Sequence, residues 1–396
     1  MTSGLAITGA ALANCLGTTS RAVFDRAFAG VDGFAPASAY AELPFATVLG
    51  VMPACDAPDE DRAVCPPTRL ASVALASARQ VRPAARAAVA RWGAHRVAYV
   101  FASSTGGLEE TERALAPDPR LPAHDPYRYA NHAIDATSVA IAQYLGVEGI
   151  RLALSTACSS SFKALASAAR LIDQGLADAA VVGSGDSLCR TTVYGFHSLG
   201  LTAPTATAPF SEARCGITLG EGSAYVVIER DVAATRPHAL ARLAGIGAAS
   251  DAFHHTSPHP EGIGGQLSMR QALDRAGLTP NEIDAISAHG TGTRLNDASE
   301  AVAVTRVFER RVPITATKSL TGHTLGSAGL TALVLAIESL RRQALPPTLR
   351  VAPIDGSLGV DVVDRLTPAR LAHVLINAFG FGGSNASVVI SQARAA

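Results

Sequence analysis

The stretch Leu152-Ala-Leu-Ser-Thr-Ala-Cys-Ser-Ser-Ser-Phe-Lys163 indicates a strand, a tight turn and a helix in immediate succession. The apolar run 150–154 is typical of a buried strand, and the small residues 155–157 favour a turn. We expect a helix from about Cys158 to Ile172. Cys158 would then stand at a helix N-terminus, where unpaired N–H groups and the helix dipole stabilise a thiolate and lower the thiol pKa. The stretch therefore predicts that Cys158 is a nucleophile.

The composition argues against several classes of function. The chain has 396 residues, of which 48% are hydrophobic, and this is enough for a large core and more than one domain-sized unit. Lys+Arg and Asp+Glu are 33 each, so the formal net charge of zero argues against a nucleic-acid partner. No uncharged apolar run reaches the ~18 residues of a membrane span. The N-terminus lacks the pattern of a signal peptide. We expect a cytoplasmic protein.

The cysteines and histidines do not form a recognisable metal motif. No C-x-x-C pair and no zinc spacing occurs, so we expect reduced thiols and no metal. The other cysteines lack the setting of Cys158, and we expect them to be structural, because free cysteines commonly behave as small hydrophobes. A metal site in the loop with His254, His255 and His259 stays open as an alternative. The five structural cysteines are Cys15, Cys55, Cys65, Cys189 and Cys215.

Strands and helices alternate along the chain, and this predicts a mostly parallel sheet covered by helices. Residues 116–132 and 195–222 are expected to be irregular, and Pro83 is expected to break or kink a helix over 70–92. A polar stretch at 235–238 divides the chain into an N-terminal half, 1–234, and a C-terminal half, 235–396. Each half contains a strand followed by a buried helix, with a functional residue at the joint. The pattern suggests a duplicated architecture.

Three further residues are expected close to Cys158. His289 ends an expected strand, in a loop of Gly and Thr, and His323 precedes a buried helix. Because open α/β sheets bind ligands at the carboxyl ends of their strands, both histidines should lie near the thiol. Lys318, in the same loop as His323, would supply a fixed positive charge to an imidazole or an acidic group. The alternative is that all three are exposed loop residues.

Two phenylalanines are candidates for the wall of the site. The turn Phe379-Gly-Phe-Gly-Gly383 indicates a tight hairpin, which could put Phe381 and its N–H beside the thiol. Phe196, in Gly195-Phe-His197, is the second candidate.

Four motifs together resemble the signatures of one family, the β-ketoacyl-[acyl-carrier-protein] synthases. The resemblance extends over essentially the whole chain. It implies a thiolase-like α/β fold of two similar halves in five layers, αβαβα. It also implies a homodimer, or a heterodimer with a related ketosynthase-like subunit. The motifs are Thr156-Ala-Cys-Ser-Ser160, Ala288-His-Gly-Thr-Gly-Thr293, Lys318-Ser-Leu-Thr-Gly-His323 and Asn377-Ala-Phe-Gly-Phe-Gly-Gly383.

The resemblance implies a decarboxylative Claisen condensation without a cofactor. Cys158 would take an acyl chain from acyl carrier protein, with an oxyanion hole formed by the N–H groups of Cys158 and Phe381. Malonyl carrier protein would then lose carbon dioxide, and His289 and His323 would stabilise the enolate that attacks the acyl group. Lys318 would support the histidines. Phe381 and Phe196 would gate the acyl pocket.

The Cys-His-His set resembles the elongating type of the family, because the CoA-primed initiating type has Asn in place of one histidine. A non-decarboxylating thiolase would need a second cysteine near the C-terminal Gly-rich turn, and a chain-length partner subunit would lack the nucleophile. Both readings stay as alternatives. Ala332 and Cys215 stand where bacterial fatty-acid synthases commonly have Glu and Asp. These departures favour a type II polyketide or aryl polyene-like pathway over a primary fatty-acid role.

Overall fold

Most of the described strands form one continuous mixed sheet. The computed structural model describes residues 4–55, 57–115 and 129–393, and its large sheet has eleven strands. In order across the sheet these are β12 (Asp361–Val362), β10 (Pro313–Thr315), β9 (Ala285–Ser287), β14 (His373–Gly380), β15 (Ser384–Gln392), β8 (Ala241–Ser250), β1 (Leu5–Asn14), β7 (Gly222–Arg230), β6 (Ala179–Asp186), β4 (Val97–Ala102) and β5 (Arg151–Leu154).

The sheet consists of two halves with the same strand order and directions. In the N-terminal half β1, β7 and β6 pair antiparallel, and β6, β4 and β5 pair parallel. In the C-terminal half β8, β15 and β14 pair antiparallel, and β14, β9 and β10 pair parallel. The halves join where β1 pairs with β8 over Leu5–Ile7. The predicted duplication is confirmed, but the sheet is mixed rather than mostly parallel.

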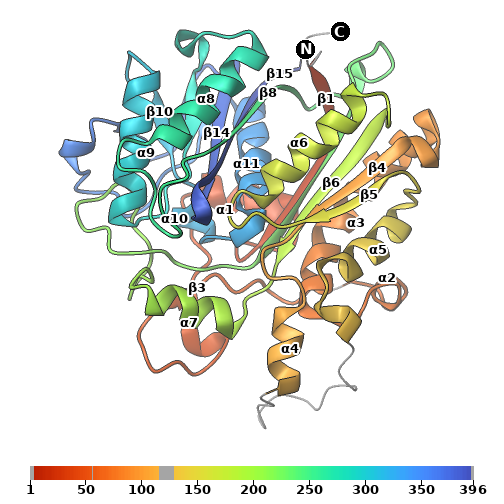
Figure 1. Cartoon of the computed structure of the whole chain (residues 1–396), viewed down its shortest axis with the longest axis horizontal. Coiled ribbons are helices and arrows are strands. Elements are labelled where there is room, and N and C mark those ends of the chain that lie inside the picture. Colours follow the sequence, from red (N-terminus) through yellow and green to blue (C-terminus); the bar gives the residue numbers. More distant parts are fainter. Residues whose placement is uncertain (1–3, 56, 116–128, 394–396) are drawn as a thin grey trace.

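Helices cover both faces of the sheet and fill the space between its halves, which gives five layers (Figure 1). Each layer of helices buries its own apolar cluster against the neighbouring strands, and the largest cluster surrounds the middle pair of helices. The outer helices are α3 (Arg69–Trp92) and α5 (Ile134–Leu145) on the N-terminal half and α8 (Ile263–Ala276) and α9 (Arg294–Val307) on the C-terminal half, with α6 (Ser160–Asp173) and α11 (Ala328–Arg342) between the halves.

The expectations that Pro83 breaks its helix and that residues 195–222 are irregular throughout are wrong. Helix α3 continues through Pro83, whose side chain is exposed while Val81 and Ala85 pack against the sheet. Burial along the whole helix therefore outweighs the lost hydrogen bond. Helix α7 (Arg190–Ser198) overlaps the segment 195–222 that was expected to be irregular. Its β-branched residues and its glycine disfavour a helix locally, so packing around the buried Val193 must stabilise it.

Strand β5 is at the edge of the sheet, and the expectation that it is buried is wrong. It pairs with β4 alone, and the side chains of Ile150 and Leu152 are 39% and 38% exposed.

Of the segment 116–132, residues 116–128 lie outside the described residues. Among the described residues, no helix has both the length and the apolar composition needed to cross a bilayer. The smaller elements include α1 (Ser20–Phe28), α2 (Asp59–Ala63), α4 (Leu108–Leu115), α10 (Lys318–Thr321), and the short pairs β2 (Ala35–Pro36) with β3 (Val48–Leu49) and β11 (Ala344–Leu345) with β13 (Thr367–Pro368).

Candidate active site

Cys158 lies in a strained turn between β5 and α6. The helix begins at Ser160 rather than at Cys158, and Ala157 has a φ of 52°, in the left-handed region. This conformation costs a residue with a Cβ about 1 kcal/mol. Hydrogen bonds hold the turn, because the Ala157 carbonyl accepts from Ser104 Oγ at 3.1 Å and from the Ser160 N–H at 3.0 Å. The thiol is held at a fixed point and is only 6% exposed.

His323 comes from the C-terminal half and reaches the thiol directly. Its Nε2 lies 3.0 Å from Cys158 Sγ. The predicted loop 318–323 is in fact the short helix α10 followed by Gly322, whose φ of 69° turns the chain back. The His323 N–H then donates to the Thr218 carbonyl at 2.7 Å, which fixes the backbone of the histidine.

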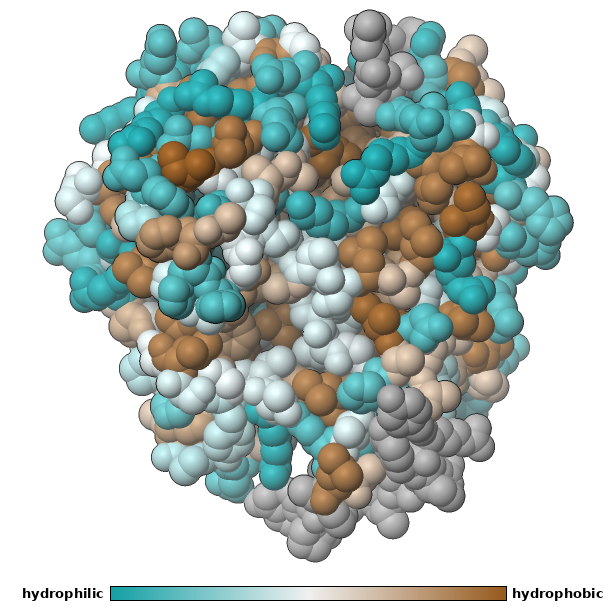
Figure 2. Space-filling view, in the orientation of Figure 1, coloured by the Kyte–Doolittle hydropathy of each residue, from teal (hydrophilic) through white to brown (hydrophobic). Residues whose placement is uncertain are grey.

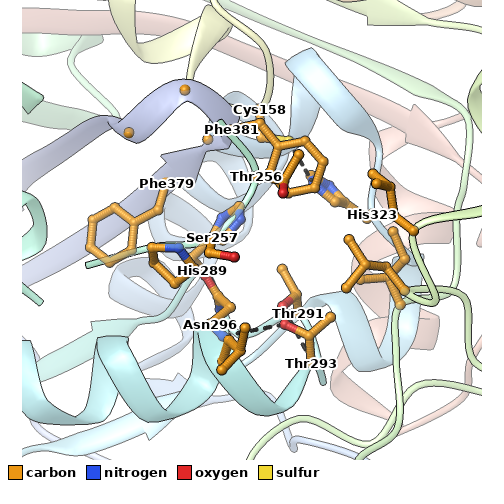
Figure 3. A pocket seen from close by; sticks show the side chains of 18 of the residues that line it. Cys158, Thr256, Ser257, His289, Thr291, Thr293, Asn296, His323, Phe379 and Phe381 are labelled. Atoms are coloured by element: carbon orange, nitrogen blue, oxygen red, sulfur yellow. Dashed lines mark hydrogen bonds between the residues drawn. The ribbon is translucent and has the colours of Figure 1, made fainter. Parts of the chain in front are cut away.

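Lys318 fixes the second histidine. Its Nζ donates to the His289 carbonyl at 2.5 Å and lies 3.2 Å from His289 Nδ1. An ammonium group has no acceptor, so Nδ1 must face it with a lone pair, and the imidazole proton is on Nε2. The ring centroids of His289 and His323 are 5.4 Å apart at an angle of 86°, and both rings border the same cavity (Figure 3). The structure therefore brings together Cys158 and the three residues predicted beside it.

Two buried acids that the sequence reasoning missed hold the His289 loop. Glu300, on α9, accepts from the N–H groups of His289 and Gly290 at 2.8 Å each, and from Asn377 Nδ2 at 3.0 Å. Asp297 accepts from the N–H of Thr291 at 3.1 Å. The signal that could have found them is two acids on a helix that directly follows the His-Gly-Thr-Gly-Thr motif.

Burial controls the protonation of the thiol. It raises the pKa of Cys158 to about 11, with the Lys318 ammonium acting in the opposite direction and the Asp186 carboxylate adding to the rise. Hydrogen bonds from the backbone N–H groups of Phe381 and of Cys158 itself lower the pKa by smaller amounts. The expectation of a lowered pKa is wrong, because the cost of desolvating a thiolate exceeds the stabilisation at the helix terminus.

The two neighbouring imidazoles are neutral at pH 7, while Lys318 stays an ammonium. Burial and the Lys318 charge hold the pKa of both His289 and His323 well below the usual value. Burial also lowers the pKa of Lys318 to about 8, although Glu300 and the thiol oppose this. The resting site is therefore a neutral thiol facing a neutral imidazole.

Phe381 and Phe196 form one wall of the cavity, as predicted, with ring centroids 5.4 Å apart. Phe381 follows Gly380, where a Cβ would stand 3.2 Å from the Cys158 backbone nitrogen. A glycine there lets the β14–β15 turn approach the thiol closely. The cavity has a volume of about 180 Å³, and its lining combines the two histidines with aromatic rings and a row of small polar side chains, among them Thr256, Ser257, Thr291, Thr293 and Asn296 (Figure 3).

The histidine-rich loop between β8 and α8 supports this wall. The His255 carbonyl accepts from the Gly382 N–H at 2.7 Å, which joins the loop to the turn that carries Phe381. His254 Nδ1 accepts from two backbone N–H groups of its own loop at 3.2 Å each. Among the residues that the structure describes, no group of three potential ligands could hold a metal ion. The alternative of a metal site in this loop gains no support.

The two positions that depart from the family pattern lie in different surroundings. Ala332 is buried in the middle layer on α11. Cys215 is exposed, and the preceding Arg214 pairs instead with Asp355, at 2.7 Å. The carboxylate partner of Arg214 therefore comes from a distant segment of the chain.

Comparison with known proteins agrees with this arrangement. Two family models match, the Beta-ketoacyl synthase N-terminal domain over residues 56–234 and the C-terminal domain over residues 240–352. The 3-oxoacyl-[acyl-carrier-protein] synthase 2 of Vibrio cholerae is 31% identical over 320 residues, 76% of each chain, and that of Coxiella burnetii is 29% identical over 411 residues, 98% of each chain. A chain in the solved complex of the ketosynthase ApeO with its chain length factor ApeC, from Xenorhabdus doucetiae, is 33% identical with a TM-score of 0.88 over 98% of both chains. The chain described here therefore belongs to the beta-ketoacyl synthase family.

Proposed function

We propose that this protein condenses an acyl group held on Cys158 with malonyl-acyl carrier protein, releasing carbon dioxide and 3-oxoacyl-acyl carrier protein. The observation that carries the proposal is one cavity that contains the Cys158 thiol, two neutral imidazoles and the turn of Phe381. The thiol can hold the acyl group and the imidazoles can stabilise an enolate. The side chains that both steps of the reaction need therefore line the same cavity.

In the first step Cys158 Sγ attacks the carbonyl carbon of the carrier thioester. Because the resting group is a thiol, His323 Nε2, at 3.0 Å, accepts its proton and passes it to the departing pantetheine thiolate. A new thioester forms on Cys158, and the carbon–sulfur bond to the carrier protein breaks. The N–H groups of Cys158 and Phe381, which already face the sulfur, form the oxyanion hole.

In the second step the malonyl carbon–carbon bond breaks and its electron pair forms an enolate as carbon dioxide leaves. Nε2–H of His289 donates to the enolate oxygen, because Lys318 holds the proton on that nitrogen. His323 is neutral again after the first step, and once its remaining proton has moved from Nδ1 to Nε2 it donates to the same oxygen. The enolate carbon then attacks the acyl carbonyl, and collapse of the adduct expels the Cys158 thiolate. Lys318 acts through His289, and Phe196 and Phe381 gate the acyl chain.

The structure favours this reaction over the alternatives. Among the described residues that line the cavity, Cys158 is the one cysteine, whereas a non-decarboxylating thiolase needs a second. A chain-length partner without activity would need neither the thiol nor the two imidazoles beside it. Ala332 and Cys215 favour a specialised type II polyketide or aryl polyene-like pathway.

We propose that the active protein has two subunits, a homodimer or a heterodimer with a related ketosynthase-like chain. This chain is similar to a chain of the solved complex between the ketosynthase ApeO and its chain length factor ApeC. Strand β5 would form part of the interface between the two subunits, since one of its edges has unpaired backbone groups. Leu152 on this strand and Ile150 directly before it are exposed. Apolar surface gathers over the region of β5 and α6 (Figure 2).

We also propose where the chain divides into its two halves and in which compartment of the cell the protein acts. The halves would be residues 1–234, with the nucleophile, and 235–396, with the histidines and Lys318. The gap between the two matched family models, at 235–239, supports this division. A cytoplasmic location suits a thiol that must stay reduced, and none of the described cysteines is in a disulfide.

The test is one assay on two variants. Cys158→Ala should form no acyl-enzyme and no 3-oxoacyl product with hexanoyl- and malonyl-loaded carrier protein. His289→Ala should retain acyl transfer to Cys158 within about threefold, while release of carbon dioxide from malonyl carrier protein falls about a hundredfold or more. Condensation by Cys158→Ala would reject the nucleophile. Loss of acyl transfer in His289→Ala, with decarboxylation intact, would reject the division of roles.

A further inference from the structure

A buried carboxylate at the end of β6 takes no part in the steps above, yet it organises the loop beside the thiol. Asp186 is completely buried, and its Oδ1 accepts hydrogen bonds from four donors of one loop. The hydroxyls of Ser103 and Thr105 donate at 2.8 Å each, and the N–H groups of Ser104 and Thr105 donate at 2.7 and 2.8 Å. Burying a carboxylate costs free energy unless hydrogen bonds compensate for the lost water, so these four hydrogen bonds hold the loop in a single conformation.

The same loop also fixes the backbone next to the nucleophile. Ser104, whose backbone nitrogen Asp186 holds, donates from its hydroxyl to the Ala157 carbonyl at 3.1 Å. Ala157 is the strained residue directly before Cys158. A strained turn persists only where its surroundings hold it, so the hydrogen bond from Ser104 helps to fix the direction of the thiol.

The same carboxylate also contacts the segment that carries His323. A Cβ on Gly326 would stand 2.7 Å from Ser104 Oγ and 2.9 Å from Asp186 Oδ2. Gly326 follows His323 by three residues, and the hydroxyls of Ser184 and Ser327 are 2.8 Å apart close by. Asp186 Oδ2 itself has no hydrogen-bond partner among the described atoms. It lies against the place where a side chain on Gly326 would stand.

We propose that Asp186 is a positioning residue that sets the distance between Cys158 Sγ and His323 Nε2. It joins the Ser104 contact on the nucleophile side to the Gly326 contact on the histidine side. Asp186 acts through these segments and does not touch the substrate. The inference rests on the proposed role of Cys158, and it predicts that the hydrogen-bond acceptor at 186 matters more for acyl transfer than the charge.

The test compares Asp186→Asn, which keeps an acceptor oxygen, with Asp186→Ala, which removes it. Acyl transfer from hexanoyl-loaded carrier protein should fall about tenfold to a hundredfold in kcat for Asp186→Ala, with KM little changed, because a small misplacement of reacting atoms is costly. Asp186→Asn should stay within about threefold of the wild type. The same changes at Asp178, which precedes β6 at its far end and pairs with Arg96 and Arg230, are the matched control.

The pH dependence of Cys158 alkylation by iodoacetamide separates charge from position. The charged and titratable groups that face the thiol are Lys318, Asp186, His289 and His323. Both Asp186 variants remove a negative charge, so both should shift the alkylation profile to lower pH. At high pH Cys158 is fully ionised, and the alkylation rate reaches its limit. Only Asp186→Ala should change this limiting rate, because only that variant removes the hydrogen bonds that hold the turn before Cys158.

A variant on the histidine side keeps the inference testable if Asp186→Ala does not fold. Gly326→Ala pushes against Ser104 and Asp186 without changing any charge, so kcat should fall about tenfold while the alkylation profile keeps its midpoint. Wild-type kcat in both Asp186→Ala and Gly326→Ala would overturn the inference, as would equal losses in Asp186→Asn and Asp186→Ala. Should the wild type take no acyl group, the proposed function fails, and the limiting alkylation rates still decide the role of Asp186.

Discussion

The environment of Cys158 makes the resting nucleophile a thiol. A cysteine at the start of a helix was expected to have a lowered pKa, but burial raises the pKa of Cys158 to about 11. Lys318 is the strongest opposing influence, and it also depresses the pKa of both histidines. One ammonium group therefore favours the thiolate and keeps the imidazoles neutral at the same time.

Replacing Lys318 by methionine should change the titration of the site in a defined direction. Loss of the ammonium removes a charge that favours the thiolate, so the pKa of Cys158 should rise by about one unit and its alkylation at pH 8 should slow about tenfold. The pKa of His289 should rise toward its ordinary value, because a like charge no longer opposes protonation. Iodoacetamide alkylation between pH 6 and 10 measures the thiol. Lys163→Met, on the outer side of α6, is the control, and an unchanged profile in Lys318→Met would contradict the assignment.

At this scale the sequence predicted the residues with reactive side chains and missed those that hold them. Cys158, His289, His323 and Lys318 were each recognisable from the strand ends that they follow. Asp186 was not, because its donors lie about eighty residues away in the chain and include two backbone N–H groups. A partner of that kind leaves no local pattern.

Among the elements, α7 shows how a helix with a weak local signal is stabilised. Its N-cap, Cys189, makes no side-chain capping bond, but Glu112 of α4 accepts from the N–H groups of Arg190 and Thr191 at 2.8 and 2.6 Å. The carboxylate thus caps the helix from another element and complements its dipole. Because α7 carries Phe196, this contact also supports the wall of the cavity.

Glu112→Ala should lower the free energy of unfolding by about 1 kcal/mol, the usual cost of a lost N-cap. Urea denaturation followed by circular dichroism measures this change. Glu110→Ala, two residues before Glu112 and therefore on another side of the same helix, controls for the general effect of removing an acid from α4. Equal stability of Glu112→Ala and the wild type would show that α7 does not depend on this cap.

Elements were predictable where their signals are local. Helix α8 (Ile263–Ala276) is an example, because it ends at Gly277, a residue type that favours the left-handed C-cap observed there with a φ of 66°. Strand β5 was misplaced because its apolar run is typical of a buried strand, while the fold puts it at an edge. Whether such a run faces a core or a second subunit depends on contacts that one chain does not contain.

For the whole molecule, the unit of a strand followed by a buried helix, present once in each half, was enough to suggest two similar halves. The antiparallel pair β14–β15 was predictable from the hairpin turn at 379–383, but the pairs of β1 with β7 and with β8 were not, because they join strands far apart in the chain; β1 and β8 form the junction of the two halves. That junction matters for chemistry, since Cys158 belongs to one half and His289 and His323 to the other. The site exists only when both halves are packed together.

Leu152→Glu should convert a two-chain assembly into single chains. The change puts a carboxylate on the exposed edge strand. The free energy needed to bury this charge in an interface is far larger than the free energy that a buried leucine contributes there. Light scattering after size-exclusion chromatography measures the mass. Leu366→Glu, an exposed leucine on the C-terminal half that is 49% exposed, is the matched control. Equal masses for both variants would contradict the place of β5 in the assembly.

The most direct test of the central claim is mass spectrometry of the protein after incubation with hexanoyl-loaded carrier protein, followed by peptide mapping. We expect the wild type to gain the mass of one hexanoyl group, located on the peptide that contains Cys158, and we expect Cys158→Ala to gain none. Addition of malonyl carrier protein should then remove the group from the wild type as the condensed product forms. An acyl group on any other residue, or on the Cys158→Ala variant, would contradict the account.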